Sequence, residues 1–116
     1  MILLNADKSI VPIEKLEHYC LSSTHVDGKH KSHLFSNLLG LDAGDAPRLQ
    51  RIISQAVQKY DAVYTKTTEH GKHYHIEFPM QGKRGEHIIR CLWIVRNSEN
   101  FPRLVSCYIK REKRRV

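Results

Sequence analysis

The sequence predicts an α+β domain in which about three N-terminal helices pack on one face of a four-stranded antiparallel sheet. In the first half of the chain, apolar residues recur every three or four positions, which is the period of a helix. In the second half they alternate with polar residues, which is the period of a strand. Helices followed by strands, rather than interleaved with them, are typical of the α+β class.

Three stretches carry the helical period: residues 12–20, 28–40 and 45–60. Proline suits the first turn of a helix, and it stands near the start of the first and third stretches. Asp45 is a suitable N-cap, and Gly40 suits the end of the second stretch. The third stretch keeps the period almost without error, so we expect it to be a core helix.

Four stretches predict strands: residues 61–66, 73–80, 87–96 and 103–110. Residues 87–96 are apolar on both faces, as in a central strand, although Arg90 lies among them. In the last strand, alternation places Val105, Cys107 and Ile109 on one face, and it places Leu104 with the polar residues on the other. We expect this second face of the sheet to gather His73, His75, Glu77, Arg90, Ser106 and Tyr108.

That polar face has two interpretations. Imidazole, carboxylate, guanidinium and hydroxyl groups are those that can bind and cleave a phosphodiester without a metal. The polar side of an antiparallel sheet is, however, more often just its solvated side. Arg103 likewise is either a bidentate phosphate ligand or a surface charge where the strand begins.

Composition narrows the class of protein. The 116 residues predict a single domain, 1–116, with a basic tail at about 110–116. The net charge of +7 indicates a polyanionic partner, most commonly nucleic acid. No apolar run reaches the ~18 residues of a membrane span, and the start lacks the features of a signal peptide. We therefore expect no membrane partner, and a location in the cytoplasm or export without a classical signal peptide.

The most basic cluster precedes the apolar part of the second predicted helix. It consists of Lys29, His30 and Lys31, with His25 and His33 nearby. A helix N-terminus binds anions, and cations placed there are slightly unfavourable for stability. The cluster therefore predicts phosphate binding. The alternative for Lys31 is a lysine that extends from the rim of the core to solvent.

Metal and cofactor sites have little support. His73 and His75 share a strand face, but the sequence supplies no evident third ligand, so we expect no metal. The three cysteines lack the paired spacing of a zinc ribbon or a disulfide framework. Phosphate-loop, dinucleotide, zinc-protease and serine-hydrolase motifs are absent from the sequence, so we also expect no cofactor.

A series of short motifs spans residues 10–108. It comprises Lys15-Leu16 with Tyr19; His25, Gly28, Lys31 and Phe35; Gly40; Gly71 and Tyr74; Arg90, Trp93 and Ile94; and Pro102-Arg-Leu-Val-Ser106 with Tyr108. In this series the chain resembles a bacterial family of uncharacterised small domains found alone or at the C-terminal ends of polymorphic toxins. That family is similar in layout to the barnase–EndoU–colicin–RelE group of ribonuclease folds.

The resemblance implies a metal-independent endoribonuclease, a toxin that cleaves tRNA or another RNA by attack of the 2′-OH. It also implies a cognate immunity protein or antitoxin as partner. The predicted catalytic residues are His25, Lys31, Arg90 and Ser106, and the predicted substrate-binding residues are Lys29, His30, His73, His75, Arg103 and Tyr108. The alternatives are a non-catalytic RNA-binding or protein-interaction domain, and a purely structural accessory domain.

Overall fold

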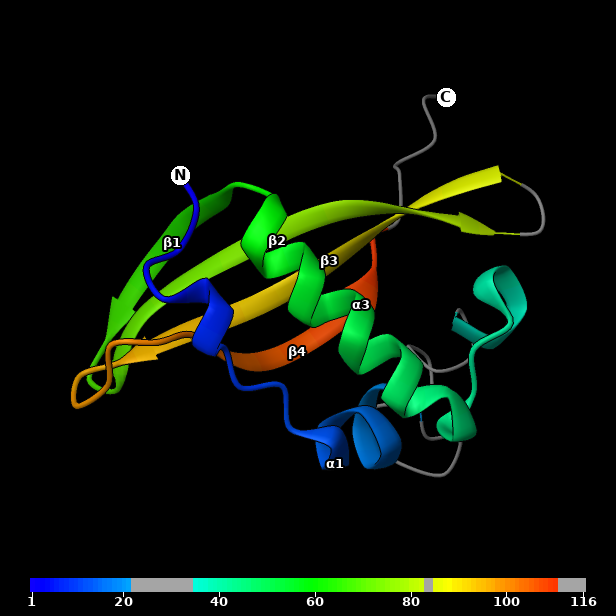
Figure 1. Cartoon of the computed structure of the whole chain (residues 1–116), viewed down its shortest axis with the longest axis horizontal. Coiled ribbons are helices and arrows are strands. Elements are labelled where there is room, and N and C mark those ends of the chain that lie inside the picture. Colours follow the sequence, from blue (N-terminus) through cyan, green and yellow to red (C-terminus); the bar gives the residue numbers. More distant parts are fainter. Residues whose placement is uncertain (22–34, 83–84, 111–116) are drawn as a thin grey trace.

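A computed structural model of the chain describes residues 1–21, 35–82 and 85–110. Figure 1 shows helical segments followed by a sheet, so the class is α+β. In chain order the elements are a 3₁₀ turn (Ala6–Lys8), α1 (Ile13–Lys15), a π-helical turn (Leu16–Cys20), a second π-helical turn (Phe35–Leu39), a 3₁₀ turn (Ala43–Asp45), α3 (Ala46–Lys59), β1 (Ala62–Thr68), β2 (Gly71–Gly82), β3 (Gly85–Arg96) and β4 (Arg103–Ile109). Within the described residues, no helix is long and apolar enough to cross a membrane.

The four strands form one antiparallel sheet in the order β1-β2-β3-β4, so each strand pairs with its neighbour in sequence. The two middle strands, β2 and β3, are the longest at 12 residues each. They pair from Gly71↔Arg96 to Gly82↔Gly85 and extend as a hairpin beyond β1 and β4 (Figure 1). On each face of the sheet, the side chains of β2 and β3 therefore lie between those of β1 and β4.

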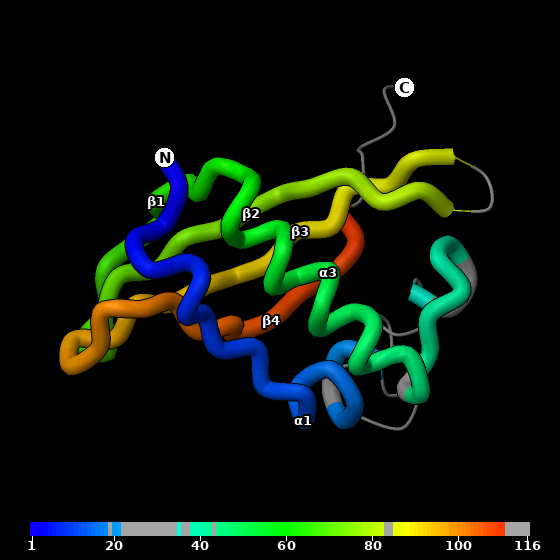
Figure 2. Tube along the Cα trace, viewed as in Figure 1, coloured from blue at the N-terminus to red at the C-terminus, as the bar shows by residue number. Residues whose placement is uncertain are grey.

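The core lies between the sheet and the helix α3, which crosses one sheet face (Figures 1 and 2). The buried stripe of α3 consists of Leu49, Ile53, Ala56 and Val57, and it meets the buried strand residues Ile76, Phe78, Ile89, Cys91 and Trp93. Tyr60 follows the helix and stacks on Phe78, with ring centroids 6.0 Å apart. This face corresponds to the apolar face that the sequence predicts.

The expectation of about three helices packed on the sheet is wrong. In the described residues α3 is the single long helix, and residues 13–20 form three α-helical residues that continue into a π-helical turn. That turn closes with a hydrogen bond from the Leu21 N–H to the Leu16 carbonyl (2.9 Å), which brings Leu16, Cys20 and Leu21 into the core together. Of residues 28–40, residues 35–39 form one π-helical turn, and residues 28–34 lie outside the described residues. Helical spacing over two turns indicates which residues are buried but does not establish a regular helix.

The predicted alternation along β4 fails at Val105. The register shifts between the pairs Leu92↔Ser106 and Trp93↔Leu104, so Val105 is an extra residue in the strand. Leu104 is consequently buried beside Trp93 on the α3 side, and Val105 does not share the face of Cys107 and Ile109. The Lys15 ammonium donates a hydrogen bond to the Val105 carbonyl (3.3 Å), which ties α1 to this bulge.

Gly71 is the residue of β2 that should tolerate substitution least. Its φ is +152°, and a Cβ there would meet the carbonyl oxygen of Val95 and lie 2.8 Å from the Arg96 Cα. We expect Gly71→Ala to lower the free energy of unfolding by about 2 kcal/mol or more, from backbone strain and overpacking together. Urea denaturation checks this value.

Gly85 provides the matched control, because its φ is +122° but no heavy atom lies within 4 Å of the position that a Cβ would take. We expect Gly85→Ala to be destabilised by backbone strain alone, and therefore by less than Gly71→Ala. Equal losses of unfolding free energy in Gly71→Ala and Gly85→Ala would show that contact of the new Cβ with β3 adds nothing to the destabilisation at Gly71.

Candidate functional site

The sheet face opposite α3, here called the outer face, carries three rows of side chains that cross β2, β3 and β4. Strand pairing defines the rows as His73–Ile94–Arg103, His75–Leu92–Ser106 and Glu77–Arg90–Tyr108. Neighbouring rows are two residues apart along each strand, or about 6.6 Å. The structure therefore brings six predicted site residues onto one face: His73, His75, Arg90, Arg103, Ser106 and Tyr108.

The row that contains Glu77 is the most strongly connected. Arg90 donates a hydrogen bond from Nε to a carboxylate oxygen of Glu77 (2.8 Å), and its Nη2 forms an ion pair with the same oxygen at 2.7 Å. The Lys110 ammonium lies 3.3 Å from that oxygen. On the other side of Arg90, a hydrogen bond with Tyr108 and then the one with Glu77 raise the pKa of the guanidinium. The sequence placed Glu77 on this face but not among the predicted site residues, and these contacts add it to the candidate site.

Glu77 is ionised at neutral pH. Burial raises the pKa of Glu77, but the hydrogen bonds from Arg90 and Lys110 outweigh it and hold the pKa below its usual 4.5. The side chains of Glu77 and Arg90 are 29% and 28% exposed, so both remain within reach of a ligand. The row therefore presents an ionised carboxylate, whose lowered pKa makes it a weaker proton acceptor than an ordinary glutamate, and cationic donors that can stabilise an anion.

This pKa shift has a consequence for stability. Because the folded state favours the ionised carboxylate, its contribution is complete above the unfolded pKa and is lost as pH falls through the lowered folded value. We expect Glu77→Gln to be less stable than the wild type at pH 7, and we expect that difference to shrink progressively as the pH falls below about 4.3, the unfolded value of a glutamate. Urea denaturation at pH 7, 5 and 3 measures the difference in unfolding free energy between the wild type and Glu77→Gln. A difference that does not change with pH would contradict the lowered pKa of Glu77.

His73 lies at the edge of the outer face nearest the β1–β2 turn. Its Nε2 is 2.9 Å from the Thr68 hydroxyl oxygen. Burial, followed by the nearby Lys66 and His70, lowers the pKa of His73 from 6.5. At neutral pH it is therefore an uncharged imidazole, which suits hydrogen bonding to a ligand better than ionic contact with a phosphate. His75 is half-buried in the next row, opposite Leu92.

Arg103 is already engaged with a carboxylate. Its Nε and Nη2 donate to the two carboxylate oxygens of Glu99, both at 2.8 Å, and its guanidinium lies 5.6 Å from the Phe101 ring centroid. The hydrogen bonds from Arg103 hold the pKa of Glu99 below its usual value. The sequence left two alternatives open for Arg103, a phosphate ligand or a surface charge. The structure shows a third, a bidentate ion pair that anchors the β3–β4 turn.

Of the remaining predicted site residues, only Ser106 lies within the described part of the chain. Ser106 is 8% exposed and lies opposite Leu92, in the middle row. His25, Lys29, His30 and Lys31 lie outside the described residues, so their roles stay predictions. In residues 1–21, 35–82 and 85–110 no three His, Cys, Asp or Glu side chains converge as a metal site requires. The expected lack of a cofactor likewise remains a prediction.

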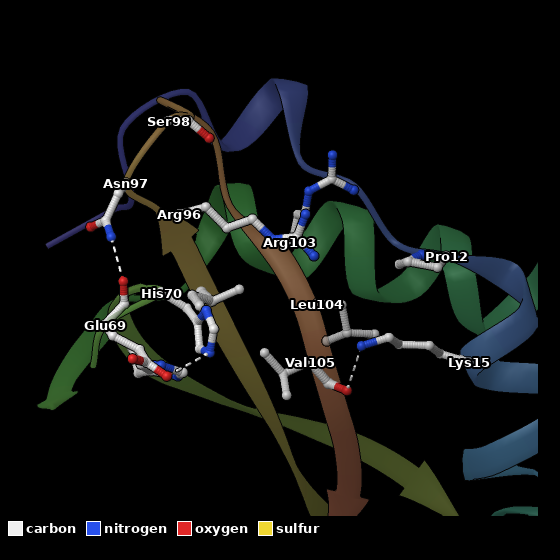
Figure 3. Close-up of a pocket in the computed structure, with 12 residues that line it drawn as sticks. Pro12, Lys15, Glu69, His70, Arg96, Asn97, Ser98, Arg103, Leu104 and Val105 are labelled. Atoms are coloured by element: carbon white, nitrogen blue, oxygen red, sulfur yellow. Dashed lines mark hydrogen bonds and ion pairs between the residues drawn. The ribbon is translucent and has the colours of Figure 1, made fainter. Parts of the chain in front are cut away.

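An open pocket of about 590 Å³, here called the turn pocket, lies at the His73 end of the outer face (Figure 3). Its lining residues are Pro12, Lys15, Glu69, His70, His73, Ile94, Arg96, Asn97, Ser98, Arg103, Leu104 and Val105. They come from the N-terminal segment with α1, the β1–β2 turn, β2, β3, the β3–β4 turn and β4. Because these segments are far apart in sequence, no motif of the chain indicates this pocket.

The family model of a domain of unknown function (DUF6883) matches residues 2–111. No curated protein sequence matches the chain. Among solved structures, the chain is similar to one described as "Contact-dependent growth inhibition toxin - immunity protein complex from Klebsiella pneumoniae 342". The TM-score is 0.61 at 17% identity, and the match covers 92% of this chain and 97% of that chain. At this identity the likeness shows a shared fold.

Proposed function

The chain belongs to the DUF6883 family, and from that premise we propose that it is a metal-independent endoribonuclease of the bacterial toxin type. The observation that carries the proposal is the ionised Glu77 beside Arg90 and Tyr108 on the outer face. A base next to cationic donors is the arrangement that cleavage of RNA by its own 2′-OH requires. The net charge of +7 supports RNA as the substrate.

In this proposal Glu77 accepts the proton of the ribose 2′-OH, and the 2′-oxygen attacks the adjacent phosphorus. The bond from phosphorus to the 5′-oxygen breaks, which leaves a 2′,3′-cyclic phosphate on one fragment and a 5′-hydroxyl on the other. Arg90 and Lys110 stabilise the negative charge that builds on the phosphate oxygens. Ser106 and Tyr108 orient the phosphate through their hydroxyl groups.

The basic cluster predicted from the sequence completes this proposal. Lys31 and Lys29 would add phosphate contacts, and His25 or His30 would protonate the leaving 5′-oxygen, as a general acid does. His75 would contact the substrate from the middle row, which adjoins the Glu77 row. Arg103 would join the substrate contacts only through a rearrangement of its ion pair with Glu99.

The toxin part of the proposal rests on fold and charge. The similar solved chain belongs to a complex of a growth-inhibition toxin with an immunity protein. We favour the toxin role over the immunity role because a net charge of +7 suits an RNA substrate. By the same reasoning a cognate immunity protein would present acidic groups to this chain, and tRNA is the RNA class that the family resemblance suggests.

The test is incubation of the purified protein with total RNA in the presence of EDTA. We expect discrete RNA fragments, and we expect single-stranded DNA to stay intact because it lacks the attacking 2′-OH. Intact RNA that nevertheless binds the protein in a salt-dependent way would contradict catalysis and indicate a non-catalytic RNA-binding domain.

A further inference from the structure

We propose that the turn pocket binds one nucleotide of a single-stranded RNA, on the same sheet face as the row in which Glu77 and Arg90 lie and separated from that row by the His75 row. This subsite rests on the proposed function, because it assumes that RNA crosses the outer face. The turn pocket is a second contact region, distinct from the Glu77 row, and it determines how the RNA strand is positioned on the sheet.

The charges of the turn pocket suit a phosphate. Three lining residues are lysine or arginine, and one, Glu69, is acidic. Arg103 is occupied by Glu99, which leaves Lys15 and Arg96 as cations for a ligand. Lys15 donates to a neutral carbonyl, that of Val105, and Arg96 is 54% exposed with its Nε 4.0 Å from Glu99. In Figure 3 Lys15 reaches across the pocket from α1 toward β4.

The remaining lining suits a base. Ile94, Val105 and Pro12 contribute apolar surface, and the turn residues Asn97 and Ser98 contribute polar groups. The Asn97 amide donates to the Glu69 carbonyl (2.6 Å), which fixes the β3–β4 turn against the β1–β2 turn. A volume of about 590 Å³ is within the roughly 300–1,000 Å³ typical of small-molecule sites. A bare phosphate would leave the apolar part unused, whereas a nucleotide uses both parts.

The position of the pocket suits an RNA strand that also reaches Glu77. His73 and Glu77 are four residues apart along β2, so the first and third rows are about 13 Å apart. A few nucleotides of single-stranded RNA span this distance. An unpaired base enters a pocket more easily than a base in a duplex, which must first lose its pairing and stacking. The geometry therefore favours single-stranded loops over helical RNA.

The test uses a labelled single-stranded RNA octamer of mixed sequence with 2′-O-methyl groups, which the proposed reaction cannot cleave. Fluorescence anisotropy gives its Kd for the wild type, Lys15→Ala and Arg96→Ala. We expect each pocket variant to bind about 5- to 10-fold more weakly, with the slope of log K against log salt reduced by about 0.7, the value of one phosphate contact on a single strand. Circular dichroism confirms that the variants are folded.

The matched control is Arg51→Ala, which removes the same charge from an exposed position of α3, on the opposite side of the sheet. We expect its Kd to stay within twofold of the wild type. If Lys15→Ala and Arg96→Ala behave like Arg51→Ala, or if the wild type does not bind the octamer, the nucleotide subsite is overturned.

Cleavage of unmodified RNA is measured separately, so the two proposals fail in different ways. Wild-type cleavage combined with unchanged octamer binding by the pocket variants would overturn the subsite and leave the ribonuclease proposal standing. Weakened octamer binding by the pocket variants, combined with no cleavage by the wild type, would overturn the ribonuclease proposal and retain the pocket as an RNA contact.

Discussion

Replacement of Glu77 by glutamine should slow RNA cleavage by about 100- to 10,000-fold, the range that loss of a general base produces. Glutamine has nearly the same shape as glutamate, but its amide cannot take the proton of the 2′-OH. RNA binding should persist or tighten slightly, because one negative charge leaves a surface that contacts phosphates. Single-turnover cleavage and anisotropy measure the two quantities.

Glu14→Gln is the control for this experiment, since Glu14 is an exposed carboxylate of α1 away from the three rows. Its cleavage rate should match the wild type. A Glu77→Gln variant that cleaves within threefold of the wild-type rate would show that Glu77 is not the base, even if the protein proves to be a ribonuclease.

Replacement of Arg90 by alanine should affect both activity and stability. Loss of a donor to the charged phosphate should slow cleavage by about 100- to 1,000-fold. The variant also loses the ion pair and the hydrogen bond to Glu77 and the hydrogen bond with Tyr108, which should lower the free energy of unfolding by about 1–3 kcal/mol. Single-turnover rates and urea denaturation measure these effects.

Two further variants separate charge from geometry at Arg90. Arg90→Lys keeps the charge but loses the planar fork that contacts Glu77, so its rate should lie between those of the wild type and Arg90→Ala. Arg51→Ala, on α3, controls for loss of one positive charge and should keep the wild-type rate. Equal rates for Arg90→Ala and Arg51→Ala would contradict a role for Arg90 in the reaction.

Where periodicity extends over many residues, it located the elements well. The 45–60 stretch forms α3 (Ala46–Lys59), and the stretch 87–96 forms β3 (Gly85–Arg96). The stretch 12–20 misled, because two turns of helical spacing fit a π-helical turn as well as an α-helix, and the described part of the stretch 28–40 likewise forms a π-helical turn over residues 35–39. There the buried side chains decided the local geometry, as the Leu16–Leu21 hydrogen bond shows.

The candidate site was predictable as a set of residues on one face, but its contacts were not. Alternation placed Glu77 and Arg90 on the outer face, yet only the register of β2 and β3 sets them directly opposite each other. The bulge at Val105 has no glycine or other signal in the sequence, so the burial of Leu104 was missed.

The Arg103–Glu99 pair and the turn pocket depend on the conformations of two turns, which composition does not specify. Both features lie where the β3–β4 turn approaches the N-terminal segment and the β1–β2 turn. A single sequence gives no sign that these segments meet. For the same reason the pocket's cations could not be assigned to one site in advance.

The most direct test of the central proposal is mass spectrometry of the ends of the RNA fragments that form in EDTA. The expected result for the wild type is a 2′,3′-cyclic phosphate on one side of each cut and a 5′-hydroxyl on the other, with Glu77→Gln giving almost no fragments. Fragments that carry a 3′-hydroxyl and a 5′-phosphate, or no fragments at all, would contradict attack by the 2′-OH and with it the role proposed for the Glu77–Arg90–Tyr108 row.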